Sequence, residues 1–230
     1  MRIFAIADPH LSGNPPSKPM TVFGDHWLNH WEKIKQDWLQ RVTAEDCVLI
    51  AGDISWAMKL AEALPDLEAI AALPGKKILI RGNHDYWWQT LSKMNRFMGD
   101  QLTFIHNTFA VAGDWAVCGS RGWVCPQDPA FTAEDQPIYD REVGRLELSL
   151  KGARQAGFDK IIAMLHYPPL YSCTEGNAIT DLLTAYGVSI CVYGHLHGET
   201  ARFACQGLIN GIEYHLVACD ALDFKLKQIV

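Results

Sequence analysis

Short runs of Ile-, Val- and Leu-rich sequence recur along the chain, and they predict strands that are buried on both faces. These runs are Ile3 to Ala7, Cys47 to Ala51, Lys77 to Ile80, Ile161 to Leu165 and Val188 to Tyr193. Amphipathic segments predict helices over roughly 25–42, 57–73 and 86–99. Because strands and helices alternate, the pattern favours an α/β fold with parallel strands.

The rest of the sequence predicts antiparallel strands and two long loops. Gly113-Asp114 between two apolar segments is typical of a tight hairpin, and the alternation after Cys205 indicates closing antiparallel strands. These strands are consistent with one mixed sheet or with two sheets packed face to face. Residues 11–24 and about 120–140 are long loops, which often carry substrate contacts. No interdomain linker is evident, so a single domain over 1–230 is expected.

Charge and composition limit which binding partners and which cellular compartment are expected for the protein. The chain has 20 basic and 26 acidic residues, a net charge of −6, so nucleic acid is an unlikely partner. No segment approaches about 18 consecutive apolar residues, which excludes a predicted membrane span. The seven cysteines lack CxxC spacing and several lie in apolar runs, as is typical of reduced core residues in a cytoplasmic protein. The short apolar N-terminus does not fit a signal peptide.

Polar residues follow five of the apolar runs at the point where each predicted strand ends. Strand ends converge on one crevice in α/β folds, and residues at i and i+2 of an extended segment share a face. We therefore expect these side chains to form one site. The candidate metal ligands are Asp8, His10, Asp53, Asn83, His166, His195 and His197.

The residue types in this group indicate a centre with two divalent metal ions. Carboxylate, imidazole and amide oxygen ligands suit Mn²⁺ first, with Fe, Zn²⁺ or Ni²⁺ as alternatives, and no cysteine is placed to join them. Seven ligands exceed the roughly three that one catalytic zinc ion uses. Two ions about 3.5–4 Å apart lower the pKa of a bridging water, so that hydroxide is available for in-line attack on a phosphoester.

These motifs resemble the calcineurin-like metallophosphoesterase superfamily, whose pattern is D-x-H, G-D, G-N-H-[DE], a lone His and G-H-x-H. All five blocks occur in order between residues 8 and 197. The resemblance implies a four-layer α/β/β/α sandwich of two mixed sheets flanked by helices. It also implies that one ion is held by Asp8, His10 and His197, the other by Asn83, His166 and His195, and that Asp53 bridges both.

Three further residues are candidates for chemistry or substrate binding. By the resemblance, His84 does not bind metal but contacts the phosphate and protonates the leaving group. An imidazole, whose unperturbed pKa is about 6.5, is suited to this role. Asp85 is adjacent and is hypothesised to orient the His84 ring. Arg121, in Gly-Ser-Arg-Gly-Trp, is the arginine favoured for substrate binding. Tyr86-Trp87-Trp88 fits either base stacking or core packing.

The predicted activity is phosphodiester or phosphomonoester hydrolysis of a small phosphorylated substrate. The Val-Asp-Arg-Gly element of the Ser/Thr protein phosphatases is missing after Gly52-Asp53, so the chain is more similar to the small bacterial phosphohydrolase and phosphodiesterase branch. Two alternatives remain: a non-catalytic scaffold of the same fold, and a nuclease of the same superfamily, for which the chain lacks a basic surplus. The sequence indicates no oligomeric state.

Overall fold

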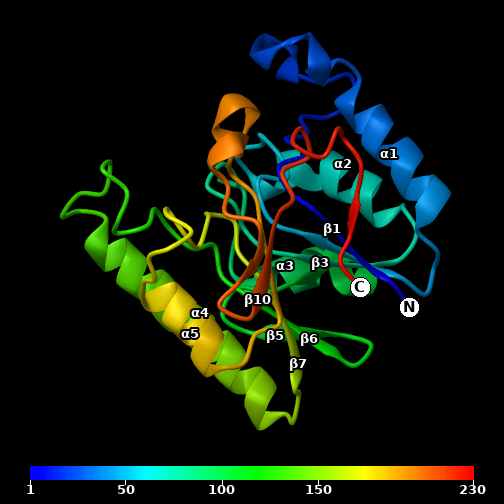
Figure 1. Cartoon of the computed structure of the whole chain (residues 1–230). Coiled ribbons are helices and arrows are strands. Elements are labelled where there is room, and N and C mark those ends of the chain that lie inside the picture. The colour runs from blue at the N-terminus through cyan, green and yellow to red at the C-terminus, as the bar shows by residue number, and fades with distance from the viewer.

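The computed structural model describes residues 1–230 as two β-sheets that lie face to face between two layers of helices (Figure 1). Helices α1 and α2 lie on one side of the sandwich, and α4 and α5 lie on the other. The order of layers is therefore α/β/β/α, which confirms the fold class expected from the sequence. The choice left open between one mixed sheet and two packed sheets is resolved in favour of two.

The first sheet has five strands, of which all but the outermost β11 are parallel to β1. Its spatial order is β11 (Lys227–Gln228), β1 (Ile3–Ile6), β2 (Cys47–Ile50), β3 (Lys76–Leu79) and β4 (Thr103–Phe104). The helices α1 (His30–Arg41), α2 (Leu60–Ala71) and α3 (Leu91–Met98) pack on its outer face. Phe4 and Ile6 of β1 contact this helical layer, and the alternating Ile3 and Ala5 face the other sheet.

The second sheet has six strands, with antiparallel pairs at both edges and parallel pairs between them. Its order is β5 (Phe109–Ala112), β6 (Trp115–Gly119), β7 (Lys160–Met164), β8 (Ile190–Tyr193), β10 (Ile212–Leu216) and β9 (Gly207–Ile209). The helices α4 (Gln136–Gln155) and α5 (Ala178–Ala185) cover its outer face, and the side chains between these helices and the sheet form a second hydrophobic core. The Gly113 hairpin between β5 and β6 forms as predicted.

An apolar layer holds the two sheets together along their inner faces. It is built from the strand residues that alternate with the helix-facing ones, such as Leu49 of the first sheet and Met164 of the second. At one end the sheets also join by backbone hydrogen bonds, since Ala7 N–H donates to Val217 O at 2.7 Å and Cys219 N–H donates to Ala7 O at 3.0 Å. The first candidate ligand, Asp8, follows Ala7 directly and thus lies at this junction.

Two helices and part of one loop differ from the sequence prediction. Neither α4 nor α5 was predicted, and the loop expected over 120–140 ends at Asp135, where α4 begins. Pro137 lies in the first turn of α4, where its missing N–H removes no helical hydrogen bond. Proline is common both in loops and in the first turn of a helix, so the Gln-Pro-Ile-Tyr segment does not by itself distinguish the two. The segment 25–42 also divides, into short 3₁₀ turns and then α1.

The prediction that all cysteines are reduced core residues is wrong for one pair. Cys173 and Cys205 form a disulfide with Cα atoms 5.3 Å apart, and the other five cysteines are free and buried. The two partners are separated by 32 residues, so no local spacing signalled the bond. None of the helices has the length and apolarity that crossing a membrane requires.

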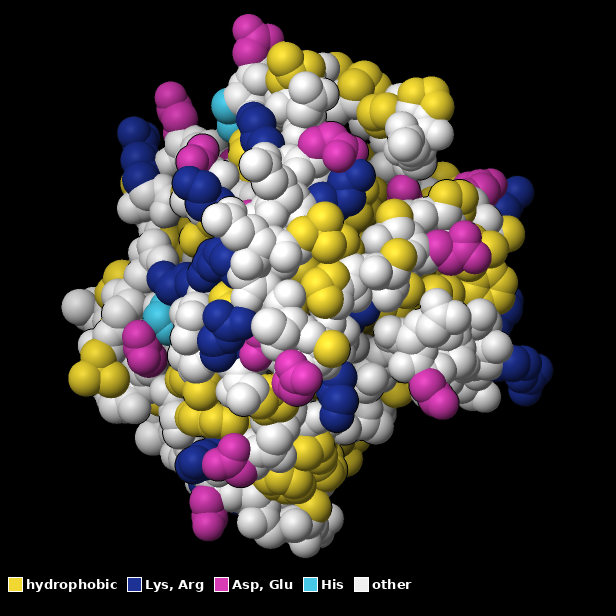
Figure 2. All heavy atoms as spheres, turned by 90° about the vertical axis from the view of Figure 1, so that its right-hand side faces the viewer, with side chains coloured by type: hydrophobic (Ala, Val, Ile, Leu, Met, Phe, Trp, Pro, Cys, Tyr) yellow, Lys and Arg dark blue, Asp and Glu magenta, His cyan; other side chains and the backbone are white.

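On the face shown in Figure 2, basic side chains are interspersed with acidic ones and with small apolar groups. This face carries no continuous basic stripe of the kind that follows a nucleic-acid backbone.

Candidate metal centre

All seven predicted ligands lie together where the strand ends of the two sheets meet. Asp8, His10, Asp53 and Asn83 follow β1, β2 and β3 of the first sheet, and His166, His195 and His197 follow β7 and β8 of the second. The sequence therefore placed each ligand at a strand end correctly. The strands belong to two sheets rather than one, so the crevice is a junction between sheets.

The backbone at several ligands adopts the left-handed region, which non-glycine residues rarely occupy. The φ angles are +61° at Asp8, +45° at His10, +50° at Asp53 and +72° at His195. Strained backbone of this kind costs roughly 1–3 kcal/mol per residue and concentrates at functional sites. These residues lie in the loops that follow β1, β2 and β8.

Glycines beside the ligands permit the close approach of the loops. A Cβ at Gly52 would lie 2.7 Å from the backbone of Gly82, and one at Gly82 or Gly194 would clash with the carboxylate of Asp53 or Asp8 respectively. The Gly-Asp, Gly-Asn and Gly-His pairs of the sequence motifs therefore have a steric cause. Any side chain at these positions would push the ligand loops apart.

One group of ligands consists of Asp8, His10 and His197, whose ligand atoms all lie within 4.8 Å of one another. His197 Nε2 is 3.5 Å from Asp8 Oδ1. Three buried atoms in this group have no hydrogen-bond partner: Asp8 Oδ1, His10 Nδ1 and His197 Nε2. Buried polar atoms are rarely left unpaired, so their gathering here fits a site that binds a cation.

A second group consists of Asn83, His166 and His195. Asn83 Oδ1 lies 2.6 Å from His166 Nε2 and 3.0 Å from His195 Nδ1. The other ring nitrogen of His166 is 3.0 Å from the carbonyl oxygen of Ala51. Both neighbours of the His166 ring are carbonyl oxygens, and a proton on Nδ1 that is donated to Ala51 would leave the lone pair of Nε2 free to bind a metal ion. Metal-binding histidines usually have an outer partner of this type.

Asp53 lies between the two groups. Its Oδ2 is 3.7 Å from His10 Nε2 and 3.5 Å from His166 Nε2, and it also forms a compact set with Asp8 and His166. Burial and the neighbouring Asp8 carboxylate raise the pKa of Asp53 to about 8. Two buried carboxylates repel each other unless positive charge is placed between them, so the donor set fits divalent cations.

His84 borders the centre without joining either ligand group. Its backbone N–H donates to Asp53 Oδ1 at 2.7 Å, which fixes the loop, and its half-buried ring lies 4.6 Å from the ring of Trp56. Trp56 also stacks on His10, with ring centroids 4.7 Å apart. Burial and nearby histidines lower the pKa of His84 below its usual value.

Asp85 does not orient the His84 ring, which corrects the hypothesis drawn from their adjacency. The fully buried Asp85 carboxylate accepts hydrogen bonds from Gly82 N–H at 2.7 Å, Ile54 N–H at 2.8 Å and Trp87 Nε1–H at 3.0 Å. It therefore ties the loop after β2 to the loop after β3. These two loops carry the candidate ligands Asp53 and Asn83, so the Asp85 carboxylate holds the two candidates in place relative to each other.

Arg121 contacts the candidate metal centre through its backbone and pairs with Glu142 through its side chain. Its guanidinium is 3.6 Å from the buried carboxylate of Glu142 and stacks over Trp123, and its carbonyl oxygen accepts the N–H groups of His166 and Tyr167. Its role in substrate binding stays a prediction. Of the three aromatics after Asp85, Trp87 and Trp88 pack in the core and Tyr86 is exposed, which decides between packing and stacking for the tryptophans.

Asp220 is a site residue that the sequence reading missed. Its Oδ1 lies 2.8 Å from His197 Nδ1, and its Oδ2 accepts Gly198 N–H at 2.8 Å. Burial alone would raise the pKa of Asp220, but the bond to His197 holds it below its usual value. Asp220 follows β10 as the ligands follow their strands. The strand-end rule would have found it if it had been applied to that strand.

An α/β/β/α sandwich that gathers carboxylate, imidazole and amide ligands where its sheets meet defines a metallophosphoesterase-type fold and site. The family model for calcineurin-like phosphoesterases matches residues 1–199, and the chain belongs to that family. No protein with a curated description matches the chain significantly.

Solved structures share the fold at low sequence identity. The calcineurin-like phosphoesterase YfkN from Bacillus subtilis is 16% identical with a TM-score of 0.58, and the match covers 94% of this chain and 80% of that one. The protein TT1561 of Thermus thermophilus is 11% identical with a TM-score of 0.64, and the match covers 99% and 97% of the two chains. Similarity at these identities concerns the fold alone.

Proposed function

We propose that this protein hydrolyses phosphoester bonds of a small substrate with two divalent cations. The observation that carries the proposal is the convergence of seven candidate ligand side chains on one sheet junction, with buried polar atoms of Asp8, His10 and His197 that lack a hydrogen-bond partner within the protein. Membership of the calcineurin-like phosphoesterase family supports it independently. Mn²⁺ is the cation expected first, with Fe, Zn²⁺ or Ni²⁺ as alternatives.

The distances support a division of the ligands into two sets with one shared carboxylate. Asp8, His10 and His197 would hold one ion, and Asn83, His166 and His195 would hold the other. Asp53 would bridge them, because its Oδ2 lies at similar distances from His10 and His166. The outer hydrogen bonds from His166 to Ala51 and from His197 to Asp220 would orient the two imidazoles.

His84 is proposed to give a proton to the leaving group. Two bound cations would supply hydroxide at neutral pH and stabilise the charge on the phosphoryl oxygens. The departing oxygen still requires a proton, and the His84 ring borders a cavity at the centre together with Trp56 and His197. The bond from its N–H to Asp53 would keep this ring at a fixed place relative to the ligands.

The direct test uses metal-stripped protein to which Mn²⁺ is returned. Bound metal is measured by elemental analysis, and hydrolysis of bis-p-nitrophenyl phosphate and p-nitrophenyl phosphate is followed by release of p-nitrophenolate. We expect about two ions per chain and turnover that depends on them. If two ions bind and neither ester is hydrolysed, the result contradicts the proposal and favours a metal-binding scaffold without catalysis.

A further inference from the structure

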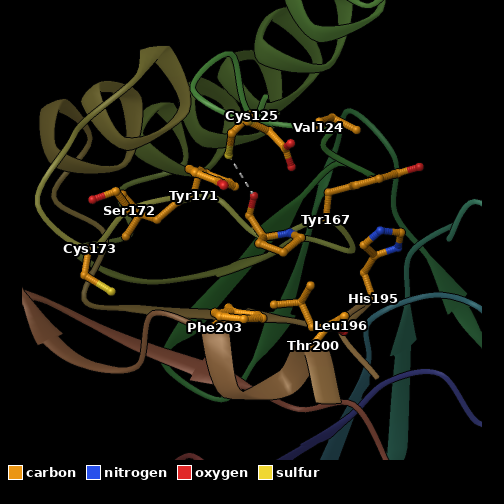
Figure 3. A pocket seen from close by; sticks show the side chains of 13 residues that line it. Val124, Cys125, Tyr167, Tyr171, Ser172, Cys173, His195, Leu196, Thr200 and Phe203 are labelled. Atoms are coloured by element: carbon orange, nitrogen blue, oxygen red, sulfur yellow. Dashed lines mark hydrogen bonds between the residues drawn. The ribbon is translucent and has the colours of Figure 1, made fainter. Parts of the chain in front are cut away.

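Besides a cavity of about 490 Å³ that His10 also lines, two separate cavities open from the candidate metal centre. One, of about 560 Å³, begins at His195 and Tyr167, and is called here the tyrosine cavity (Figure 3). The other, of about 310 Å³, is lined by His10, His84 and Trp56, and is called the tryptophan cavity. They share no lining residue. Both volumes fall in the range of roughly 300–1,000 Å³ that is usual for small-molecule sites.

One segment of backbone, residues 195–200, contributes lining residues to both cavities. His195, Leu196 and Thr200 line the tyrosine cavity, whereas His197 and Gly198 line the tryptophan cavity. Each cavity therefore begins at a different group of candidate ligands. A phosphorus atom bound between those groups would have an organic group within reach of each cavity.

The two long loops predicted from the sequence each supply a wall of one cavity. The loop around Val124 and Cys125 lies along one side of the tyrosine cavity, and Met20 and Phe23 of the loop after Leu11 line the tryptophan cavity. In Figure 3, Phe203 and Leu196 form the wall opposite Val124 and Cys125. Loops of this length beside a site usually serve a ligand rather than the fold.

The tyrosine cavity is mainly apolar, and its far end is covalently fixed. Eight of its 13 lining residues are hydrophobic, including Phe203, Leu170 and Tyr171. Cys173 lines the far end and is bonded to Cys205, which follows the short helix that carries Phe203. The disulfide holds the two walls together, so the cavity is formed before a ligand binds.

The charges around both cavities favour a substrate with little negative charge. No Lys or Arg lines either cavity, and the acidic side chains Asp128 and Asp220 line one each. A phosphomonoester has one organic group and could fill only one of the two cavities, whereas a phosphodiester has two. A second phosphate or carboxylate on the substrate would find no cationic partner there.

Building on the proposed function, we infer that the substrate is a phosphodiester with an uncharged, apolar group that occupies the tyrosine cavity. The second organic group, in the tryptophan cavity beside His84, is the one that leaves. Hydroxide oxygen forms the new bond to phosphorus, the ester bond to the leaving oxygen breaks, and that oxygen takes a proton. The products are an alcohol and a monoester that keeps the apolar group.

The test varies only the retained group of the substrate. The Mn²⁺-loaded protein is given p-nitrophenyl phosphate, methyl p-nitrophenyl phosphate and phenyl p-nitrophenyl phosphate, which release the same p-nitrophenolate. Phe203→Ala shortens a wall of the tyrosine cavity at a side chain that is 64% exposed, so the fold should tolerate it. Leu208→Ala is the matched control, since Leu208 is 77% exposed and lines neither cavity.

We expect kcat/KM for the phenyl diester to exceed that for the methyl diester by about 10-fold or more, because the ring is buried on binding. Both diesters should exceed the monoester. Phe203→Ala should lower the phenyl-to-methyl ratio by about 3- to 10-fold, and Leu208→Ala should leave it unchanged.

Three results would overturn the inference: equal kcat/KM for the two diesters, an equal loss for both in Phe203→Ala, or faster hydrolysis of the monoester. These are distinct from failure of the proposed function. That failure would appear as no hydrolysis of any of the three esters by protein shown to hold two metal ions, and the inference would then fall with it.

Discussion

The two sheets contribute different chemistry to the same centre. The first sheet supplies both carboxylates and the amide, in Asp8, Asp53 and Asn83, together with His10. The second supplies only imidazoles, in His166, His195 and His197. Each ligand group combines residues from both sheets. Neither sheet alone carries every member of either ligand group, so the candidate centre is complete only where the two sheets meet.

The carboxylates of the first sheet and the imidazoles of the second also differ in what they require: the carboxylates need positive charge between them, and the imidazoles need to be oriented. The carboxylates of the first sheet are buried close together and need positive charge between them, as the raised pKa of Asp53 indicates. Two imidazoles of the second sheet are held by outer partners, His166 by Ala51 and His197 by Asp220. Changes in the first sheet should therefore abolish metal binding, and changes around the second should weaken it by degrees.

The largest effect is expected for Asp53→Asn. Asparagine keeps the shape and an oxygen that can accept the His84 N–H, but it removes the negative charge shared by both ions. Loss of metal should exceed the roughly 10- to 100-fold expected for an outer partner, and turnover should fall to background. Metal content after dialysis and thermal unfolding with and without Mn²⁺ would measure this. Full metal occupancy in the variant would show that Asp53 does not bridge the ions.

A large but separable effect is expected for His84→Ala. Because His84 belongs to neither ligand group, both ions should remain, while kcat should fall by about 10²- to 10⁴-fold for esters with poor leaving groups. The loss should be much smaller for p-nitrophenyl esters, whose leaving oxygen hardly needs a proton. The comparison of phenyl and p-nitrophenyl leaving groups is therefore the internal control. Equal loss of metal in His84→Ala and Asp53→Asn would contradict the assigned roles.

The sequence predicted where the candidate ligands lie, because each follows an apolar run as a local feature. An apolar run that ends in Asp-x-His or His-x-His needs no knowledge of its neighbours, and glycines such as Gly82 and Gly194 mark where loops approach. The division of the strands into two sheets depends on long-range pairing, as between Ala7 and Ala218. For the same reason, no pattern indicated the disulfide from Cys173.

Two other features were missed although they had local signals. The start of α4 is marked by Pro137, and Asp220 stands after a strand as the ligands do. Pro137 fits either a helix start or a loop, and Asp220 fits either the partner of a ligand or a turn residue. In both cases only packing decides between the two interpretations. The role of Arg121 in substrate binding and the organisation of residues 1–230 as a single domain stay predictions.

The smallest effect is expected for Asp220→Asn, which leaves every ligand in place. Loss of the Asp220 carboxylate should weaken metal binding by about 10- to 100-fold, the usual effect of removing a hydrogen-bond partner of a metal-binding histidine. Asp223→Asn is the matched control, because Asp223 is exposed and pairs only with Lys225. Calorimetric titration with Mn²⁺ would measure both variants, and equal affinities would show that Asp220 does not act through His197.

The pH dependence of that affinity distinguishes orientation from general destabilisation. Burial alone would lower the pKa of His197, but Asp8 and Asp220 raise it to about 10 in the metal-free protein. At neutral pH a metal ion must therefore displace a proton from His197, so affinity rises by about tenfold per pH unit for that proton until the pKa is passed. Without the Asp220 charge the pKa of His197 falls and less proton is displaced, so the slope with pH should flatten. A parallel loss at every pH would instead indicate that Asp220→Asn only disturbs the fold around β10.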